Sequence, residues 1–351
     1  MEKNKIICLN LDTIKNKNIY QFDEMSKFGY SYICCGYLND KSNINSSYYK
    51  YYKYPKSIIA RVKFIFKLLL KNKNSLSHIE LYTGGGSFLA IEYLMAKLLF
   101  IKVCVVERGS PLRDLNSYYK FFPRISRKYI YKNAIQVWIR ELWMKDALYK
   151  LKRDNYFFLS NAISIPIEFS HSYKKQYDFI WCNSFIKWRN IDWFIDNLNK
   201  NNFSNNISVV LGMLENNKTT YEVENYVKIN KPKKCTLLNF QNPKEYFLNS
   251  KFFILPADIV YLNFALLEAM SYGVVPIVSD VEGTREIVDD GINGIIANHS
   301  KEGLEEAMTK AINMSDDEYE IMSKNARIKV IEKFSVESWA KKLNTMYENL
   351  K

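Results

Sequence analysis

Residues 255–294 read LPADIVYLNFALLEAMSYGVVPIVSDVEGTREIVDDGING, and their pattern is the most informative one in the chain. An apolar run ends at Leu255, a loop follows, and apolar residues then fill a helical pattern from Asn263 to Gly273. A second apolar run ends at Ser279. The succession of strand, helix and strand predicts neighbouring parallel strands with the connecting helix packed on the sheet.

The same alternation runs along the whole chain. Apolar runs typical of strands lie at Lys5–Leu9, Ser31–Cys35, His78–Tyr82, Lys102–Glu107, Ala134–Ile139, Tyr156–Leu159, Phe179–Cys182, Ser208–Leu211, Cys235–Leu238, Phe252–Leu255, Val275–Ser279 and Gly294–Ala297. Helical patterns such as Ala90–Leu99, Asp192–Asn199 and Ala265–Tyr272 separate many of them. The runs fall into two sets of similar size, before and after residue 165, which predicts two doubly wound α/β domains. We place them at residues 1–165 and 174–333.

Composition excludes several classes of protein. The chain has 351 residues, of which 48% are hydrophobic, so it can bury large cores and is not mainly disordered. No apolar run is long enough to span a membrane, and the four apolar residues after the charged N-terminus are too few for a signal peptide. The six cysteines show no metal-ligand spacing, so we expect reduced core residues of a cytoplasmic protein and no structural zinc.

The net charge of +13 is concentrated in the first half of the chain. Residues 1–170 hold 28 Lys and Arg against 13 Asp and Glu, whereas residues 171–351 hold 22 against 24. Residues 41–79 contain nine basic residues and no acidic one, with tyrosines interleaved before a helical apolar pattern. A second basic aromatic stretch, Tyr118–Lys132, repeats this chemistry.

Three interpretations of these basic stretches remain open. They form a face that docks on an anionic membrane surface, a core-facing helix with a solvated basic side, or a groove that stacks nucleic-acid bases. The membrane interpretation is favoured, and nucleic acid is not expected as a partner of the whole protein. The predicted membrane face consists of Lys50, Lys53, Arg61, Lys63 and Lys67.

The opening stretch also suggests a binding site for a nucleotide. The helix that starts at Asn263 presents free amides and the positive end of its dipole, which suit a diphosphate. Glu268 lies in its second turn, where a carboxylate can accept hydrogen bonds from ribose hydroxyls. Gly283 and Thr284 follow the next strand and offer a second set of exposed amides.

The run from Leu267 to Gly294 resembles family 4 of the retaining glycosyltransferases, which have the GT-B fold. The matching motifs are Leu-Glu-Ala-Met followed by Gly-x-x-Pro, and Gly-x-x-Glu-Ile-Val-x-x-Gly-x-x-Gly. The resemblance implies two Rossmann-like domains that face each other across a cleft. Residues 334–351, with Phe334-Ser335 before Trp339, resemble the family's closing helix, which packs back across the domains.

The sequence departs from the family pattern at named positions. The first of the family's two glutamates falls on Val260, whereas Glu268 is the second. The family's arginine position holds Ser184 and its lysine position holds Arg189, with Lys187 as a possible second charge. These changes bear on which donor sugar is used and on activity.

The resemblance implies roles for residues in both domains. The donor nucleotide and its diphosphate are assigned to Ser184, Lys187, Arg189, Asn263, Phe264, Glu268, Gly283 and Thr284. Gly84, Gly85 and Gly86 resemble the acceptor-side glycine loop, and a tight turn is the alternative. Glu107 and Arg108 follow a strand, where they either orient the acceptor in catalysis or form a structural ion pair.

We therefore predict a glycosyltransferase that moves a sugar from a nucleotide donor, UDP- or GDP-linked, with retention. The acceptor is expected to be a lipid-linked saccharide in bacterial surface polysaccharide synthesis, lipopolysaccharide or capsule, and the protein peripheral on the inner face of the plasma membrane. No Asp-x-Asp motif occurs, so we expect no metal and no other cofactor. The alternative is a catalytically silent nucleotide-sugar-binding protein.

Overall fold

The computed structural model of the chain describes residues 4–11, 16–37, 46–83, 88–107, 121–142, 144–215, 218–239, 241–260 and 263–350. Internal contacts divide the chain into two compact units. The first consists of Met1–Ser164 and Val336–Lys351, and the second of Ile165–Ser335. The last helix of the chain is thus part of the first unit.

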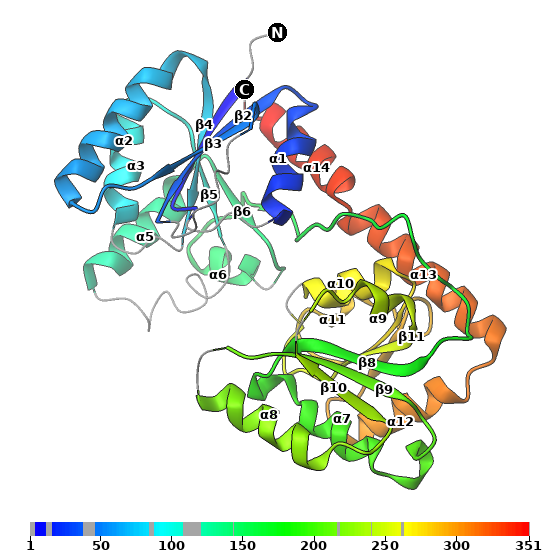
Figure 1. Cartoon of the computed structure of the whole chain (residues 1–351). Helices are drawn as coiled ribbons and strands as arrows, with labels where there is room; N and C mark the ends of the chain where they lie inside the picture. Colours follow the sequence, from blue (N-terminus) through cyan, green and yellow to red (C-terminus); the bar gives the residue numbers. More distant parts are fainter. Residues whose placement is uncertain are drawn as a thin grey trace. The chain divides into compact units, whose positions relative to one another are not determined.

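The first unit is built on a parallel sheet with the order β3-β2-β1-β4-β5-β6-β7 (Figure 1). Its strands are β1 (Asn4–Leu9), β2 (Tyr30–Gly36), β3 (Tyr49–Lys53), β4 (Leu76–Tyr82), β5 (Val103–Val106), β6 (Gln136–Ile139) and β7 (Phe157–Phe158). Its helices are α1 (Asn16–Ser26), α2 (Ile58–Asn72), α3 (Leu89–Leu98), α5 (Phe121–Asn133), α6 (Met144–Lys150) and α14 (Val336–Glu348).

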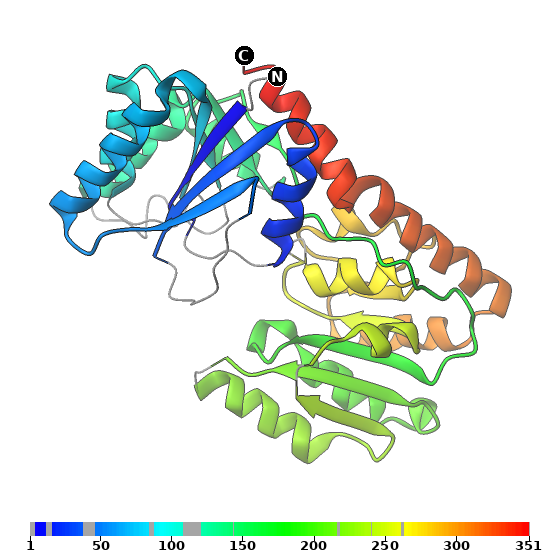
Figure 2. The same ribbon diagram turned by 45° about the horizontal axis from the view of Figure 1, so that its top comes forward.

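Both faces of this sheet are covered, because successive side chains of a strand point to opposite faces. On β1, Ile7 and Leu9 pack into a core with α2, α3, α5 and α6. Ile6 and Cys8 pack into a second core with α1 and α14 on the other face. Figure 2 shows α1 and α14 side by side on that face.

The second unit is built on a parallel sheet with the order β10-β9-β8-β11-β12-β13. Its strands are β8 (Tyr177–Ser184), β9 (Ser208–Met213), β10 (Cys235–Asn239), β11 (Ser250–Leu255), β12 (Val275–Ser279) and β13 (Ile295–Ala297). Its helices are α7 (Ile191–Leu198), α8 (Lys218–Asn230), α9 (Lys244–Leu248), α10 (Phe264–Ser271), α11 (Thr284–Ile287), α12 (Lys301–Ile312) and α13 (Asp316–Phe334).

The two sheets share one topology, and the prediction of two doubly wound α/β domains is confirmed. In the second unit the chain moves outward from β8 to β10 and then returns to place β11 on the other side of β8. The strand order therefore reverses between β8 and β11, and the corresponding reversal in the first unit lies between β1 and β4. Such switch points leave a crevice at the carboxyl ends of the strands, where ligands bind.

Strand β3 is the element that the sequence analysis missed. Tyr49–Lys53 belongs to the basic stretch in which tyrosines precede the helical apolar pattern, and no strand is predicted there. It is the edge strand of the first sheet, parallel to β2, with Tyr49 on the core face and Lys50 exposed. Lysines on an edge strand discourage pairing with a second chain.

The predicted state of the cysteines is confirmed: all six are buried and none forms a disulfide. Within the described residues no helix is both long and apolar enough to cross a membrane.

Candidate functional site

The switch point of the second unit is held together by hydrogen bonds of three asparagines. The Asn263 side chain accepts a hydrogen bond from the Leu266 amide (3.0 Å) and thereby caps α10, while it donates to Oδ1 of Asn183 (3.1 Å). Asn190 donates to the Pro256 carbonyl (2.9 Å) and to Asp258 (2.6 Å). The loops that leave β8 and β11 are thus fixed against each other at the carboxyl edge.

Arg189 is a half-buried cation at this edge. It lies in a short 3-10 turn, Lys187–Arg189, with its guanidinium carbon 4.5 Å from the ring centre of Trp188. Burial lowers the pKa of Arg189 to about 10, and Glu215 offsets this only in part, so the group stays charged at neutral pH. No salt bridge reaches it within the described residues, and its buried Nε has no partner there. Lys187, beside it, is exposed.

The other predicted donor residues surround the same edge. Ser184 is buried at the end of β8, and Phe264 and Glu268 are half-buried on α10. Glu268 lies close enough to Cys182 of β8 to add to the effect of burial, which raises the pKa of that thiol to about 12. Val260, at the position of the family's first glutamate, is buried, and its amide donates to the Glu282 carbonyl (3.0 Å).

One prediction about this edge is wrong. Thr284 does not present free groups to a diphosphate, because its amide donates to the Val281 carbonyl (3.2 Å) and its hydroxyl to the Ser279 carbonyl (2.6 Å). The side chain is fully buried. Gly283 precedes it with φ of 91°, a left-handed conformation that favours glycine, and turns the chain into α11.

In the first unit, Glu107 is a buried carboxylate. It follows β5 directly, is 0% exposed, and accepts hydrogen bonds from the hydroxyls of Thr83 (3.2 Å) and Tyr131. These contacts join the chain segments that follow β4 and β5 to each other and to α5. Arg108 and the glycines Gly84, Gly85 and Gly86 lie outside the described residues.

The predicted membrane face needs one correction. Lys50 and Lys53 are exposed on β3, and Lys63 and Lys67 are exposed on α2. Arg61, by contrast, is only 2% exposed and forms a salt bridge with Glu92 (2.7 Å). It cannot present its charge to a membrane, because partners inside the unit attract it and the face of α2 on which it lies packs on the sheet.

Asn10 and Tyr54 complete this buried cluster at the carboxyl edge of the first sheet. Arg61 donates to the Asn10 side chain (2.6 Å) and lies 3.9 Å from the ring centre of Tyr54. Glu92 also accepts hydrogen bonds from Asn10 (2.5 Å) and from the Tyr54 hydroxyl (3.4 Å).

Sequence reasoning missed Asn183 and Asn190 at the second edge and the Arg61 cluster at the first. Asn190 carries one signal in retrospect, since asparagine tolerates the left-handed φ of 48° that it adopts before α7. No comparable local signal marks Asn183 or Glu92, because their partners lie 80 and 31 residues away in the chain. Within the described residues no cluster of side chains suits a metal ion.

The chain is similar to known glycosyltransferases. Residues 166–329 match the family model described as Glycosyl transferases group 1. An uncharacterized glycosyltransferase of Methanocaldococcus jannaschii is 21% identical over 346 residues, which cover 96% of this chain and 86% of that protein.

Solved structures share the fold over nearly the full chain. A glycosyltransferase from Rickettsia africae superposes with a TM-score of 0.78 at 12% identity, covering 100% of this chain and 99% of that chain. HepE of Anabaena in complex with UDP superposes with a TM-score of 0.78 at 10% identity, covering 99% and 100%. HepE has also been solved with UDP-glucose. The second unit is therefore a glycosyl transferases group 1 domain, and the protein is a glycosyltransferase enzyme with the GT-B fold.

Proposed function

We propose that this protein transfers a sugar from a nucleotide-sugar donor, with UDP or GDP as the carrier, to a lipid-linked saccharide. The observation that carries the donor half of the proposal is Arg189, a half-buried cation at the switch point with no salt bridge among the described residues. Glu215 offsets the burial of this charge only in part, and a partly buried charge is costly unless a ligand supplies the rest of the compensation. A diphosphate supplies it, and the UDP-glucose complex of HepE supports that choice.

In the proposed reaction, the bond between the anomeric carbon and the diphosphate oxygen breaks, a bond from that carbon to an acceptor hydroxyl oxygen forms, and the proton of this hydroxyl passes to the leaving diphosphate. Negative charge grows on the leaving diphosphate, so cations that wait at that position lower the barrier. Arg189 and Lys187 supply them, and the start of α10, capped by Asn263, adds the positive end of a helix dipole. Glu268 binds the ribose. Retention at the anomeric carbon is proposed from the family resemblance.

No metal is required in this proposal, because side-chain cations and the helix end neutralise the diphosphate. We expect the transfer rate to be unchanged by a chelator. A rate that is abolished by the chelator and restored by a divalent cation would contradict this part of the proposal.

The lipid-linked acceptor is proposed from the charge of the first unit. The first unit carries the excess of basic residues, and Lys50, Lys53, Lys63 and Lys67 are exposed on neighbouring elements of it. Such a surface suits the anionic inner leaflet of a bacterial plasma membrane, where lipid-linked saccharides for surface polysaccharides are assembled. We therefore place the enzyme in the cytoplasm, peripheral on that membrane.

A thermal-shift screen of nucleotide sugars, followed by a transfer assay on membrane lipid extract, tests the proposal. The correct donor raises the melting temperature by mass action and labels a lipid-soluble product. Failure of every UDP- and GDP-sugar to bind would overturn it. Binding with no turnover on any lipid fraction favours the second candidate, a catalytically silent binding protein, for which buried Val260 and Ser184 at the family's charged positions are the specific observation.

A further inference from the structure

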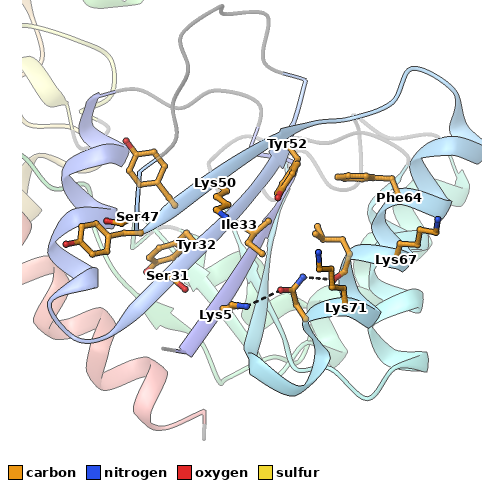
Figure 3. Close-up of a pocket in the computed structure, with 14 residues that line it drawn as sticks. Lys5, Ser31, Tyr32, Ile33, Ser47, Lys50, Tyr52, Phe64, Lys67 and Lys71 are labelled. Carbon is orange, nitrogen blue, oxygen red and sulfur yellow. Dashed lines mark hydrogen bonds between the residues drawn. The ribbon is translucent and has the colours of Figure 1, made fainter. Parts of the chain in front are cut away.

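A groove of about 520 Å³ opens in the first unit between the edge of the sheet and helix α2 (Figure 3). Lys5 of β1 and Lys50 of β3 line it from the sheet, and Lys67 and Lys71 line it from α2. The rings of Tyr52 and Phe64, whose centres are 6.0 Å apart, also line it. We call this site, defined by these six residues, the β3–α2 groove.

The charge of the groove is one-sided. Four lysines line it and no acidic residue does. None of the four forms a salt bridge within the described part of the chain. Lys5 is only half-buried and donates to the neutral Asn72 side chain (3.5 Å). Like charges gathered around one cavity repel one another unless an anion occupies it, so the groove is complementary to a polyanionic group such as phosphate.

Three of the four lysines lie at the end of the groove that is away from the carboxyl edge of the sheet. Lys5 is the second residue of β1, and Lys67 and Lys71 belong to the second half of α2. Tyr52 lies at the other end of the groove, because it pairs with Cys35, which in turn pairs with the last residue of β1. Reacting ligands of such sheets bind at the carboxyl ends, so an anion held by Lys5, Lys67 and Lys71 lies apart from the donor diphosphate.

The helix that carries Lys67 and Lys71 also exposes apolar side chains. Ile59, Phe66 and Leu70 are 67%, 39% and 48% exposed, and the last two directly precede Lys67 and Lys71 in the helix. Helices that expose both lysines and large apolar residues are typical of segments lying in the headgroup layer of a membrane. This combination identifies the anion as part of a lipid rather than of a freely diffusing molecule.

We propose that the β3–α2 groove is a binding site for the phosphate of an anionic membrane lipid, with Ile59, Phe66 and Leu70 in contact with its acyl region. The proposal rests on the membrane location given in the proposed function. It adds that one lipid phosphate binds at a defined site, in addition to the general attraction between the exposed lysines and an anionic membrane. In the bound state, Lys67 and Lys71 on one wall and Lys50 on the other donate to phosphate oxygens.

Two variants distinguish lipid binding in the groove from a general attraction between surface lysines and the membrane. Ser31→Trp fills the groove and leaves every charge in place, whereas Lys67→Gln with Lys71→Gln removes two charges and leaves the space. Lys56→Gln with Lys73→Gln is the matched control, because both lysines are exposed at the ends of α2 and neither lines the groove. Binding of the full chain is measured by co-sedimentation with phosphatidylcholine vesicles that contain phosphatidylglycerol, and folding of each variant by its melting temperature.

We expect Ser31→Trp and the Lys67/Lys71 pair each to weaken vesicle binding about tenfold or more, and the control pair to weaken it several-fold less. Wild-type binding by a folded Ser31→Trp protein, or equal loss in the two lysine pairs, would overturn the site. Saturable binding of soluble glycerol phosphate with no binding to vesicles would overturn the lipid as its source. The vesicle assay contains no nucleotide sugar, so a negative result in it does not contradict the proposed sugar transfer. A negative result in the transfer assay, in turn, does not contradict lipid binding by the groove.

Discussion

Arg61 and Glu92 form a buried salt bridge, with Nη2 of Arg61 2.7 Å from Oε1 of Glu92. Burial raises the pKa of Glu92, so the carboxylate depends on its partners to stay charged. We expect Arg61→Met to lower the free energy of unfolding by about 3–5 kcal/mol, because it leaves a buried charge unpaired.

The double variant with Arg61→Met and Glu92→Leu should recover most of that loss, since it removes both charges. Lys63→Met, on the exposed side of the same helix, is the control and should change stability by less than about 0.5 kcal/mol. Denaturant titration measures all three. A double variant as unstable as the single one would show that the ion pair itself does not cause the loss.

His78 should make the first unit sensitive to acid. The imidazole is 0% exposed beside the Tyr347 ring, and burial lowers its pKa to about 3 from the usual 6.5. Between these two values the unfolded chain binds a proton that the folded state does not. Stability is therefore full above pH 6.5 and falls as the pH decreases, by about 2 kcal/mol at pH 5.

His78→Phe keeps a ring against Tyr347 and removes the titrating group. Its unfolding free energy, measured by denaturant titration from pH 7.5 to about 4.5, should depend less on pH than that of the wild type. Parallel curves for the two proteins would assign the acid sensitivity to other groups.

Asn263 should link stability to donor binding. Asn263→Ala removes the cap of α10 and the partner of Asn183, and we expect a loss of about 1 kcal/mol or more in unfolding free energy. Affinity for the nucleotide sugar should also fall, because the loop after β11 loses its anchor. Ser300→Ala is the matched control, since Ser300 caps α12 in the same unit. Denaturant titration should show a loss of stability in both variants. Calorimetric titration with the nucleotide sugar should show a loss of affinity only in Asn263→Ala, and equal affinity losses in the two variants would contradict this role of Asn263.

Arg189 should recognise the diphosphate and not the base. Arg189→Gln removes a charged hydrogen-bond donor worth about 1.5–3 kcal/mol, so the dissociation constant of UDP-glucose should rise about 10- to 100-fold. Uridine binding should not change. Lys228→Gln, a surface change in the last turn of α8, is the control. An equal loss for uridine and UDP-glucose would place Arg189 against the base instead.

Gly273 should tolerate no side chain. A Cβ there would lie 2.6 Å from the Ser170 carbonyl oxygen and 2.8 Å from the His171 ring, and φ is +81°. Gly291 has φ of +71° with nothing within 4 Å, so Gly291→Ala carries the conformational cost alone, about 1–2 kcal/mol. Gly273→Ala should cost about 1–3 kcal/mol more, measured as unfolding free energy. Equal losses would mean that the chain around Ser170 moves aside.

The strands that could be predicted from the sequence are those with a clear run of apolar residues. The buried strands read as apolar runs because both faces of a parallel sheet are covered, so β8 and β11 were identifiable without a partner. Strand β3 was not, because an edge strand tolerates lysine on its open side and then resembles a basic loop. Asn263 was identifiable as the start of α10 from the helical pattern that follows it, but the hydrogen bonds that occupy Thr284 depend on how the chain turns after β12.

The order and spacing of side chains along the chain were enough to predict the alternation of strands and helices and the two domains. The burial of Arg61 beside exposed Lys63 and Lys67, and the gathering of Lys5, Lys50, Lys67 and Lys71 around one groove, come from tertiary packing. Such outcomes depend on contacts between distant residues. A charged side chain can be buried where the fold places an opposite charge beside it, as Glu92 lies beside Arg61. The spacing of residues along the chain does not show which distant residues come together.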